Sequence, residues 1–265
     1  MTRRLGCIFL IVLSMVFWIV RCSPAYKDLS TANGRQAILD QANNDLTAGD
    51  CGSAIDILTP LVHSQYNNND VLMLFASAFA CQGGVNFPNL IGNLKDLGSD
   101  DIWSVLVKTN FSPGSGDGHV AALDTAAAEI YQTATPAGNT AASQRSADAN
   151  TFLVFIELNQ IASVISPLGS ATKATGRKTV AITGTGSIAD MCHVQVAVTQ
   201  ISDSLQFVSA GSAISNVVSN INTACAAIPG GACPANHDFT ACLTTLPYQL
   251  QGQLLINAID STWQF

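Results

Sequence analysis

The chain has 265 residues, of which 48% are hydrophobic and 11% are charged, so it can bury a sizeable core and is not disordered as a whole. Its 11 Lys and Arg residues against 18 Asp and Glu residues give a net charge of -7. A nucleic-acid partner is disfavoured, because the chain has too little positive charge to neutralise a run of phosphates.

The first 22 residues have the order of an export signal. Two arginines precede an apolar run from Leu5 to Val20, which is slightly shorter than the roughly 20 residues that a membrane-spanning helix needs. Loss of this segment, which holds three of the 11 basic residues and no acid, leaves 8 basic against 18 acidic residues, or -10. We therefore expect the rest of the chain to be carried across a membrane.

The apolar run ends at Arg21 and Cys22, and an apolar run that ends at a cysteine resembles the lipobox of bacterial lipoproteins. In that family the cysteine is acylated and becomes the first residue of the mature chain. Here Arg21 replaces the Gly, Ala or Ser of the family pattern. The resemblance implies lipidation at Cys22 and, with Ser23 beside it, an outer-membrane lipoprotein that faces the periplasm. The alternatives are an uncleaved signal anchor and ordinary cleavage near Ala25, which would give a secreted protein.

Six cysteines remain when Cys7 leaves with the leader and Cys22 is taken as the lipid site. An even number in an exported chain predicts three disulfides, although the sequence alone leaves their pairing open. A metal site is the alternative, but its candidate ligands lack the closely spaced cysteine pairs that hold zinc. Those candidate ligands are Cys225, Cys233, Cys242 and His237, and the cysteines predicted to form disulfides are Cys51, Cys81, Cys192, Cys225, Cys233 and Cys242.

A 34-residue spacing marks the first third of the chain. Gly49-Asp50-Cys51 is followed by Ala54-Ile55, and Gly83 stands 34 residues after Gly49. This segment, from about residue 36 to residue 97, resembles a pair of tetratricopeptide repeats, whose period is 34 residues. Cys51 replaces the aromatic residue usual in the family. Pro88 occupies the place of a small alanine, so the last helix of the pair is expected to be short or to begin late.

The resemblance to tetratricopeptide repeats implies two antiparallel helix pairs, in each of which a glycine ends the first helix. Cys51 then begins one helix and Cys81 ends its antiparallel neighbour, so the repeat geometry implies a Cys51 to Cys81 disulfide. Stacked helix pairs present a concave surface that binds peptides or other proteins.

Capping residues and hydrophobic spacing predict helices in the rest of the chain. These helices cover about residues 100–108, 119–133, 142–166 and 250–260, together with 188–227, either as one helix or as two joined near Gly211. The segment 142–166 is expected to be a core helix and not a membrane span, because it carries Glu157, Asn159 and Gln160. Cys233 to Cys242 is predicted to be a stapled loop with a short helical turn, and Cys192 is expected to pair with Cys225, Cys233 or Cys242.

Residues 169–186 form the least helical part of the chain. Gly184, Gly186 and Ala189 have the spacing of a dinucleotide-binding turn, and Asp203 follows where such proteins place an acid for the ribose. No second strand follows, however, since the helical period continues. A loop before a helix is therefore the preferred interpretation.

The sequence contains no catalytic motif. The two Glu residues, Glu129 and Glu157, stand singly on predicted helices. The four His residues lack the spacing of a metal ligand set or a nucleophile's base; they are His63, His119, His193 and His237. We therefore expect no enzyme, no cofactor and no metal.

The predicted architecture is all-α. Residues 1–22 form the leader, 23–98 the tetratricopeptide-like repeats and 99–265 an irregular, disulfide-stapled helical domain. The resemblances imply a membrane-tethered bacterial envelope lipoprotein that acts as a protein-interaction or assembly scaffold, with an envelope protein or peptide as its partner. The alternative is a periplasmic carrier of a small apolar solute or lipid, bound between the helices of the C-terminal half.

Overall fold

The computed structural model describes residues 28–64, 68–85, 100–112, 118–133, 141–184, 186–208, 212–231 and 233–265. These residues form ten α-helices and one 3₁₀ turn and contain no β-strand, which confirms the all-α prediction. The leader, Cys22 and the predicted last helix of the repeat region around Pro88 lie outside the described residues. The elements are α2 (Ala32–Ala48), α3 (Cys51–Ser64), α4 (Asn69–Gln82), α6 (Ile102–Thr109), α7 (His119–Tyr131), η2 (Ala142–Gln144), α8 (Ala147–Leu168), α9 (Ile188–Leu205), α10 (Ser212–Ala226), α11 (Phe239–Thr244) and α12 (Leu246–Thr262).

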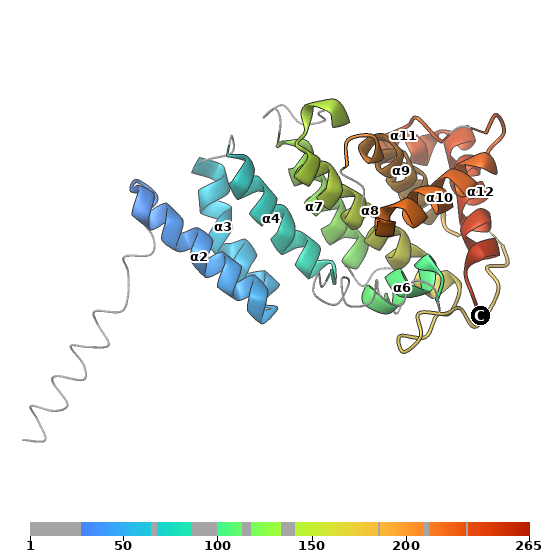
Figure 1. Ribbon diagram of the computed structural model, residues 1–265, viewed down its shortest axis with the longest axis horizontal. Helices are drawn as coiled ribbons and strands as arrows, with labels where there is room; N and C mark the ends of the chain where they lie inside the picture. The colour runs from blue at the N-terminus through green and yellow to red at the C-terminus, as the bar shows by residue number, and fades with distance from the viewer. Residues whose placement is uncertain are drawn as a thin grey trace, which may run out of the picture.

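The helices α2, α3 and α4 form an N-terminal layer at the narrow end of the molecule (Figure 1). Gly49 ends α2 with a left-handed backbone conformation, φ 78°, which a residue with a side chain rarely adopts, so α3 begins two residues later and turns back on α2. Asn68 caps α4 through its side chain. The layer is held together by one apolar cluster, which includes Ile38 of α2, Leu58 of α3 and Leu72 of α4.

Cys51 at the start of α3 and Cys81 at the end of α4 form a disulfide, with their Cα atoms 5.6 Å apart. The pairing implied by the repeat resemblance is therefore confirmed. The two ends meet because consecutive helices with a short connection run antiparallel. In the loop-entropy model a bridge across 30 residues stabilises the fold by about 3 to 4 kcal/mol.

The remaining helices continue the row along the long axis of the molecule, since α4 packs on α7, α7 on α8, α8 on α9 and α9 on α12 (Figure 1). One apolar cluster joins α4, α7 and α8, and a larger one joins α6, α8, α9, α10 and α12. The apolar interior therefore consists of three clusters that follow one another along the row of helices.

The helix α8 is the core of the molecule. Its length and composition would suffice to cross a membrane, but 72% of its most apolar window is buried inside the protein. It also carries the buried polar residues Glu157, Asn159 and Gln160. The prediction of a core helix is therefore supported. The helix begins at Ala147 and not at 142, because Ser146 caps it and residues 142–144 form a separate 3₁₀ turn.

The C-terminal helices are stapled by two further disulfides, Cys192 to Cys242 and Cys225 to Cys233. Of the two alternatives for residues 188–227, one helix or two joined near Gly211, the structure has two helices, α9 and α10. The last helix starts at Leu246, one turn before the predicted Leu250, because Pro247 lies in the first turn, where a missing N–H is tolerated.

The loop between α8 and α9 is fixed against the end of the chain. Lys178 Nζ donates a 2.7 Å hydrogen bond to Asp260 Oδ1, and Trp263 Nε1 donates one of 2.9 Å to the carbonyl of Gly176. The prediction of a loop in place of a nucleotide-binding strand and turn is confirmed for the part of 169–186 that the structure describes.

Gly252 sets the distance between α12 and α9. A Cβ atom at this position would lie 2.0 Å from the carbonyl oxygen of Met191, which belongs to the α9 backbone. We therefore expect Gly252→Ala to lower the free energy of unfolding by about 1–3 kcal/mol, because the two helices must move apart. The measurement is thermal unfolding followed by circular dichroism.

Gly52→Ala is the matched control, since a Cβ atom on Gly52 in α3 would meet nothing within 4 Å. Here the better helix propensity of Ala is expected to raise stability by up to about 1 kcal/mol. Equal effects of the two substitutions would contradict the close contact between α12 and α9.

Candidate functional site: a polar pocket beside the central helix

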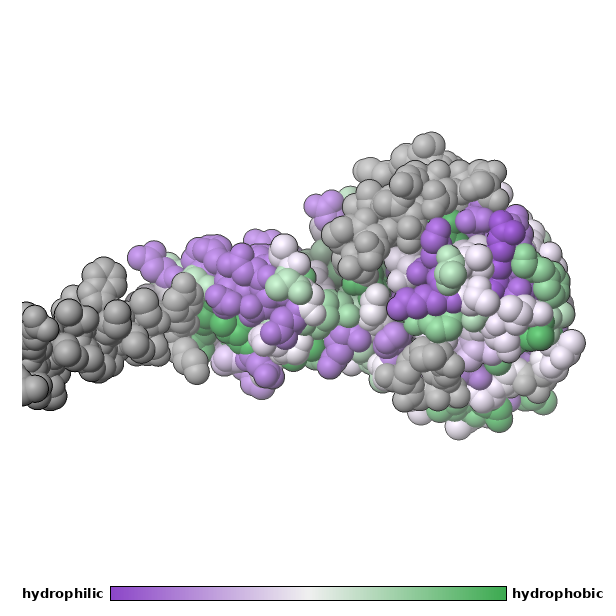
Figure 2. Space-filling model, turned by 90° about the horizontal axis from the view of Figure 1, so that it is seen from below, coloured by the Kyte–Doolittle hydropathy of each residue, from purple (hydrophilic) through white to green (hydrophobic). Residues whose placement is uncertain are grey.

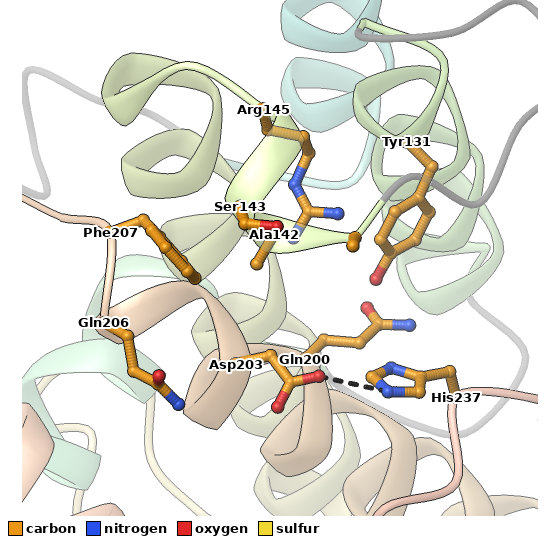
Figure 3. Close-up of a pocket in the computed structure, with 10 residues that line it drawn as sticks. Tyr131, Ala142, Ser143, Arg145, Gln200, Asp203, Gln206, Phe207 and His237 are labelled. Carbon is orange, nitrogen blue, oxygen red and sulfur yellow. Dashed lines mark ion pairs between the residues drawn. The ribbon is translucent and has the colours of Figure 1, made fainter.

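A pocket of about 460 Å³ lies between the end of α7, the η2 turn, the C-terminal end of α9 and the segment before α11 (Figure 3). Four of its residues belong to one stretch of α9 and the turn after it, namely Gln200, Asp203, Gln206 and Phe207. Their spacing of three or four positions along most of that stretch places them on one side of the helix. The pocket is lined by Tyr131, Ala141, Ala142, Ser143, Arg145, Gln200, Asp203, Gln206, Phe207 and His237.

Arg145 brings a positive charge to the pocket wall. Its side chain is buried, its Nε donates a 3.0 Å hydrogen bond to Asn150 Oδ1, and its Nη2 donates one of 3.2 Å to Ser204 Oγ. The guanidinium carbon lies 5.1 Å from the centre of the Tyr131 ring. Burial lowers the pKa of Arg145, but a guanidinium keeps its charge in proteins.

Asp203 and His237 form an ion pair on the opposite side of the pocket (Figure 3). His237 Nε2 lies 3.1 Å from Asp203 Oδ2, and both side chains are more than 40% exposed, so a ligand can reach them. A buried pair of amides positions the histidine: Asn236 Nδ2 donates to Gln195 Oε1 at 2.9 Å, and Gln195 Nε2 donates to the carbonyl of Asn236 at 3.1 Å.

Two neutral polar groups complete the lining. Burial raises the pKa of Tyr131 well above its usual 10.0, so its phenol stays protonated. Gln200 on α9 is only 6% exposed, and its Oε1 atom is buried without a hydrogen-bond partner among the described residues. An unsatisfied buried amide destabilises a fold, which makes Gln200 a natural contact for a ligand.

Glu157 lies behind this pocket on α8. It is 1% exposed, and burial raises its pKa well above 4.5; the charge of Asp124 adds to the rise and that of Arg145 opposes it. Burial therefore favours the protonated, neutral form of Glu157. In the sequence Glu157 stands as a single acid on a predicted helix, and its nearness to Asp124 of α7 arises from the packing of α7 on α8.

A second polar cluster crosses α7, α8 and α9. Gln160 Nε2 donates a hydrogen bond to Asp124 Oδ1 and lies 3.0 Å from His193 Nδ1. The His193 ring stacks on Phe239, with the ring centres 4.2 Å apart. These contacts join α7, α8 and α9 to the start of α11, so the cluster has a structural role.

The residues considered for a metal site do not form one. Cys225 and Cys233 are bonded to each other, and Cys242 is bonded to Cys192, so none of the three is a free thiolate. In the part of the chain that the structure describes, no three metal-ligating residues come together. Sequence reasoning missed the pairing of His237 with Asp203, because 34 residues separate them and no motif connects them.

A second hollow, of about 590 Å³, lies between α2 and α3 in the N-terminal layer. Apolar side chains form part of it, and the carboxylates of Asp45 and Asp56 lie among them. Residues 28–85 hold six Asp against one Arg, or -5. Figure 2 shows hydrophilic side chains over this narrow end of the molecule, with hydrophobic ones between them. The α2/α3 groove is lined by Leu29, Ile38, Gln41, Asp45, Ser53, Asp56, Ile57 and Pro60.

Comparison with models of known protein families gave no match, and searches of curated proteins and of solved structures found no similar protein. The function proposed below therefore rests on the geometry of these two sites.

Glu157→Gln is expected to stabilise the protein at neutral pH. The folded state keeps the proton on Glu157, whereas the unfolded chain releases it above about pH 4.5. Because the unfolded chain then binds fewer protons, this group lowers the free energy of unfolding by up to about 1.4 kcal/mol for each pH unit of increase. Gln copies the protonated form at every pH. Wild type and variant should therefore unfold alike near pH 4, and the variant should be more stable at pH 7.

Glu129→Gln serves as the control, because burial raises the pKa of this half-buried carboxyl in the same direction. Its effect should have the same sign and be smaller. A difference between Glu157→Gln and wild type that does not change with pH would contradict a buried neutral acid.

Proposed function

We propose that the protein is a membrane-tethered interaction or assembly protein of a bacterial envelope, and that it docks a partner in the α2/α3 groove. The observation that carries the proposal is the combination of a groove of about 590 Å³ with a surface of net charge -5 over residues 28–85. The partner is an envelope protein or peptide that offers an apolar side chain flanked by Lys or Arg.

The chemistry of the groove favours such a partner. Ile57 and Pro60 of α3 and Leu29 before α2 provide apolar contact, while Asp45 and Asp56 supply negative charge from the two facing helices. An apolar centre with charged residues around it is the usual arrangement of a docking site. Opposite charges on the partner would speed its approach and fix its orientation.

The N-terminal layer is a rigid support for this surface. Ala54 and Leu58 of α3 are fully buried against α2 and α4, and the Cys51 to Cys81 disulfide ties α3 to the end of α4. A groove between helices held in this way loses little conformational freedom on binding. The resemblance to tetratricopeptide repeats adds support by analogy, since helix pairs of that family dock peptides and proteins.

The apolar carrier receives less support from the described residues. The interface between α8 and α9 is filled by buried side chains such as Leu158, Ile161 and Val198. The pocket next to this interface is lined mainly by polar groups. The interaction protein is therefore the function that we put forward.

Site-specific crosslinking in intact cells tests the docking groove. A photo-crosslinking residue at Ser53, which lines the groove, should capture a defined partner, whereas the same residue at the exposed Leu250 of α12 should not. Replacing Asp45 and Asp56 by Lys should lower the affinity for that partner about tenfold or more, since like charges that face each other cost several kcal/mol.

Asp40→Lys is the matched control, because Asp40 is exposed on α2 outside the groove and the substitution changes the charge in the same way. Equal capture at Ser53 and Leu250, or equal losses in the groove variants and in Asp40→Lys, would refute the proposed docking site.

The tether is tested separately at Cys22. Cys22→Ala removes the proposed site of acylation, so the protein should move from the membrane fraction to the soluble fraction. Fractionation of cells that express each form, followed by mass spectrometry of the N-terminal peptide, provides the measurement. Unchanged membrane association in the variant would show that Cys22 is not the anchor.

A further inference from the structure

We infer that the pocket beside α8 binds a small zwitterionic solute, an amino acid or a short peptide, with the carboxylate against Arg145 and the ammonium group against Asp203. This site is separate from the α2/α3 groove and shares no residue with it. Its volume of about 460 Å³ lies within the range of small-molecule pockets, about 300–1,000 Å³.

The pocket carries opposite charges on opposite walls. Figure 3 shows Arg145 entering from the side of η2 and Asp203 from α9, with open space between them. Tyr131 beside them is neutral, because burial raises the pKa of its phenol. A ligand with one positive and one negative end therefore matches the lining, whereas a dianion such as phosphate would be repelled by Asp203.

Arg145 suits a carboxylate. Its guanidinium is buried, and the hydrogen bonds described above fix its orientation through the neutral side chains of Asn150 and Ser204. A guanidinium held in place forms charge-assisted hydrogen bonds with a carboxylate, which are stronger than those with a neutral acceptor. The interaction is stronger at such a site than in water, because the surroundings are less polar.

Asp203 suits an ammonium group. Its Oδ2 is paired with His237, while its Oδ1 makes no hydrogen bond with any residue that the structure describes. Gln200, one turn before it on α9, presents the buried Oε1 that lacks a partner. An ammonium group has three donors, and these two oxygens on the same side of α9 would accept two of them.

Phe207 defines the side-chain preference of the ligand. It lines the same pocket and leaves 40% of its surface exposed, so it offers an apolar face at the rim. The structure therefore favours amino acids with an apolar side chain over charged ones.

Thermal unfolding with each standard amino acid, in L and D forms, and with simple dipeptides provides the test. At a concentration well above its dissociation constant, a ligand that binds only the folded protein should raise Tm by several degrees. The N-acetylated and the C-amidated forms of the same compound should have no such effect, because each lacks one of the two charges.

Two variants locate the site. Arg145→Gln should abolish the shift, but Arg145 also supports the fold, so Asp203→Asn at an exposed position provides the second test. Asp203→Asn should unfold like wild type without ligand and should lose at least about tenfold in affinity. Asp148→Asn, at an exposed position of α8 outside the pocket, should keep the full shift.

Three results would overturn the inference. The first is that no free amino acid or dipeptide raises Tm. The second is that acetylated or amidated forms, or inorganic phosphate, give the same shift as the free compound, which would indicate a site with no need for both charges. The third is that Asp203→Asn retains the wild-type response. None of these results bears on crosslinking in the α2/α3 groove.

Discussion

The burial of α8 is the constraint on which the rest of the structure depends. A helix of 22 residues whose side chains are all buried from Ile156 to Ser166 needs neighbours on several sides, and α6, α7 and α9 provide them. Its backbone groups are satisfied within the helix, so only its polar side chains need partners. Asn110, for example, donates from Nδ2 to the carbonyl of Asn159 at 3.1 Å and to Ser163 Oγ at 3.0 Å, which fixes the end of α6 against α8.

The polar pocket follows from where this central helix begins. Asn150 in the first turn of α8 donates to the carbonyl of Ala142 and accepts from Arg145, so one side chain holds the η2 turn and orients the guanidinium. On the opposite wall, the disulfide from Cys192 to Cys242 ties α11 to α9, and the hydrogen bonds between Asn236 and Gln195 hold the segment before α11 on α9. His237, next to Asn236 in this segment, thereby lies 3.1 Å from Asp203.

Local signals in the sequence specify the helices well. Gly49 ends α2 as predicted, since its effect on the backbone depends on a few neighbouring residues. The cap Ser146 was not recognised, so the predicted start at 142 lies before the true start of α8 at Ala147. The Cys51 to Cys81 pairing could be expected from the resemblance to tetratricopeptide repeats, whose antiparallel helices would bring the two ends together. The start of α12 lies one turn before the predicted one, because Pro247 fits the first turn of a helix.

The candidate pocket could not be predicted in the same way. Tyr131, Arg145, Asp203 and His237 come from four different segments, and only the packing of α7, α8 and α9 brings them together. Each is unremarkable in its own segment, since a single Arg, Asp or His on a helical surface has many ordinary roles. Long-range pairings of this kind leave no periodic signal.

The distribution of unsatisfied polar atoms distinguishes the two halves of the molecule. In the described part of the N-terminal layer, residues 28–64 and 68–85, every buried side-chain polar atom has a hydrogen-bond partner. The C-terminal half instead keeps Glu157 Oε2, Asn159 Oδ1 and Gln200 Oε1 buried without one. Apolar residues at these positions would avoid the free-energy cost of a buried polar atom without a partner. Proteins accept such a cost mainly at functional sites. The N-terminal layer is thus built as a stable support that presents an outer surface, whereas α9 keeps one of these unsatisfied atoms, Gln200 Oε1, in a residue that lines the open pocket.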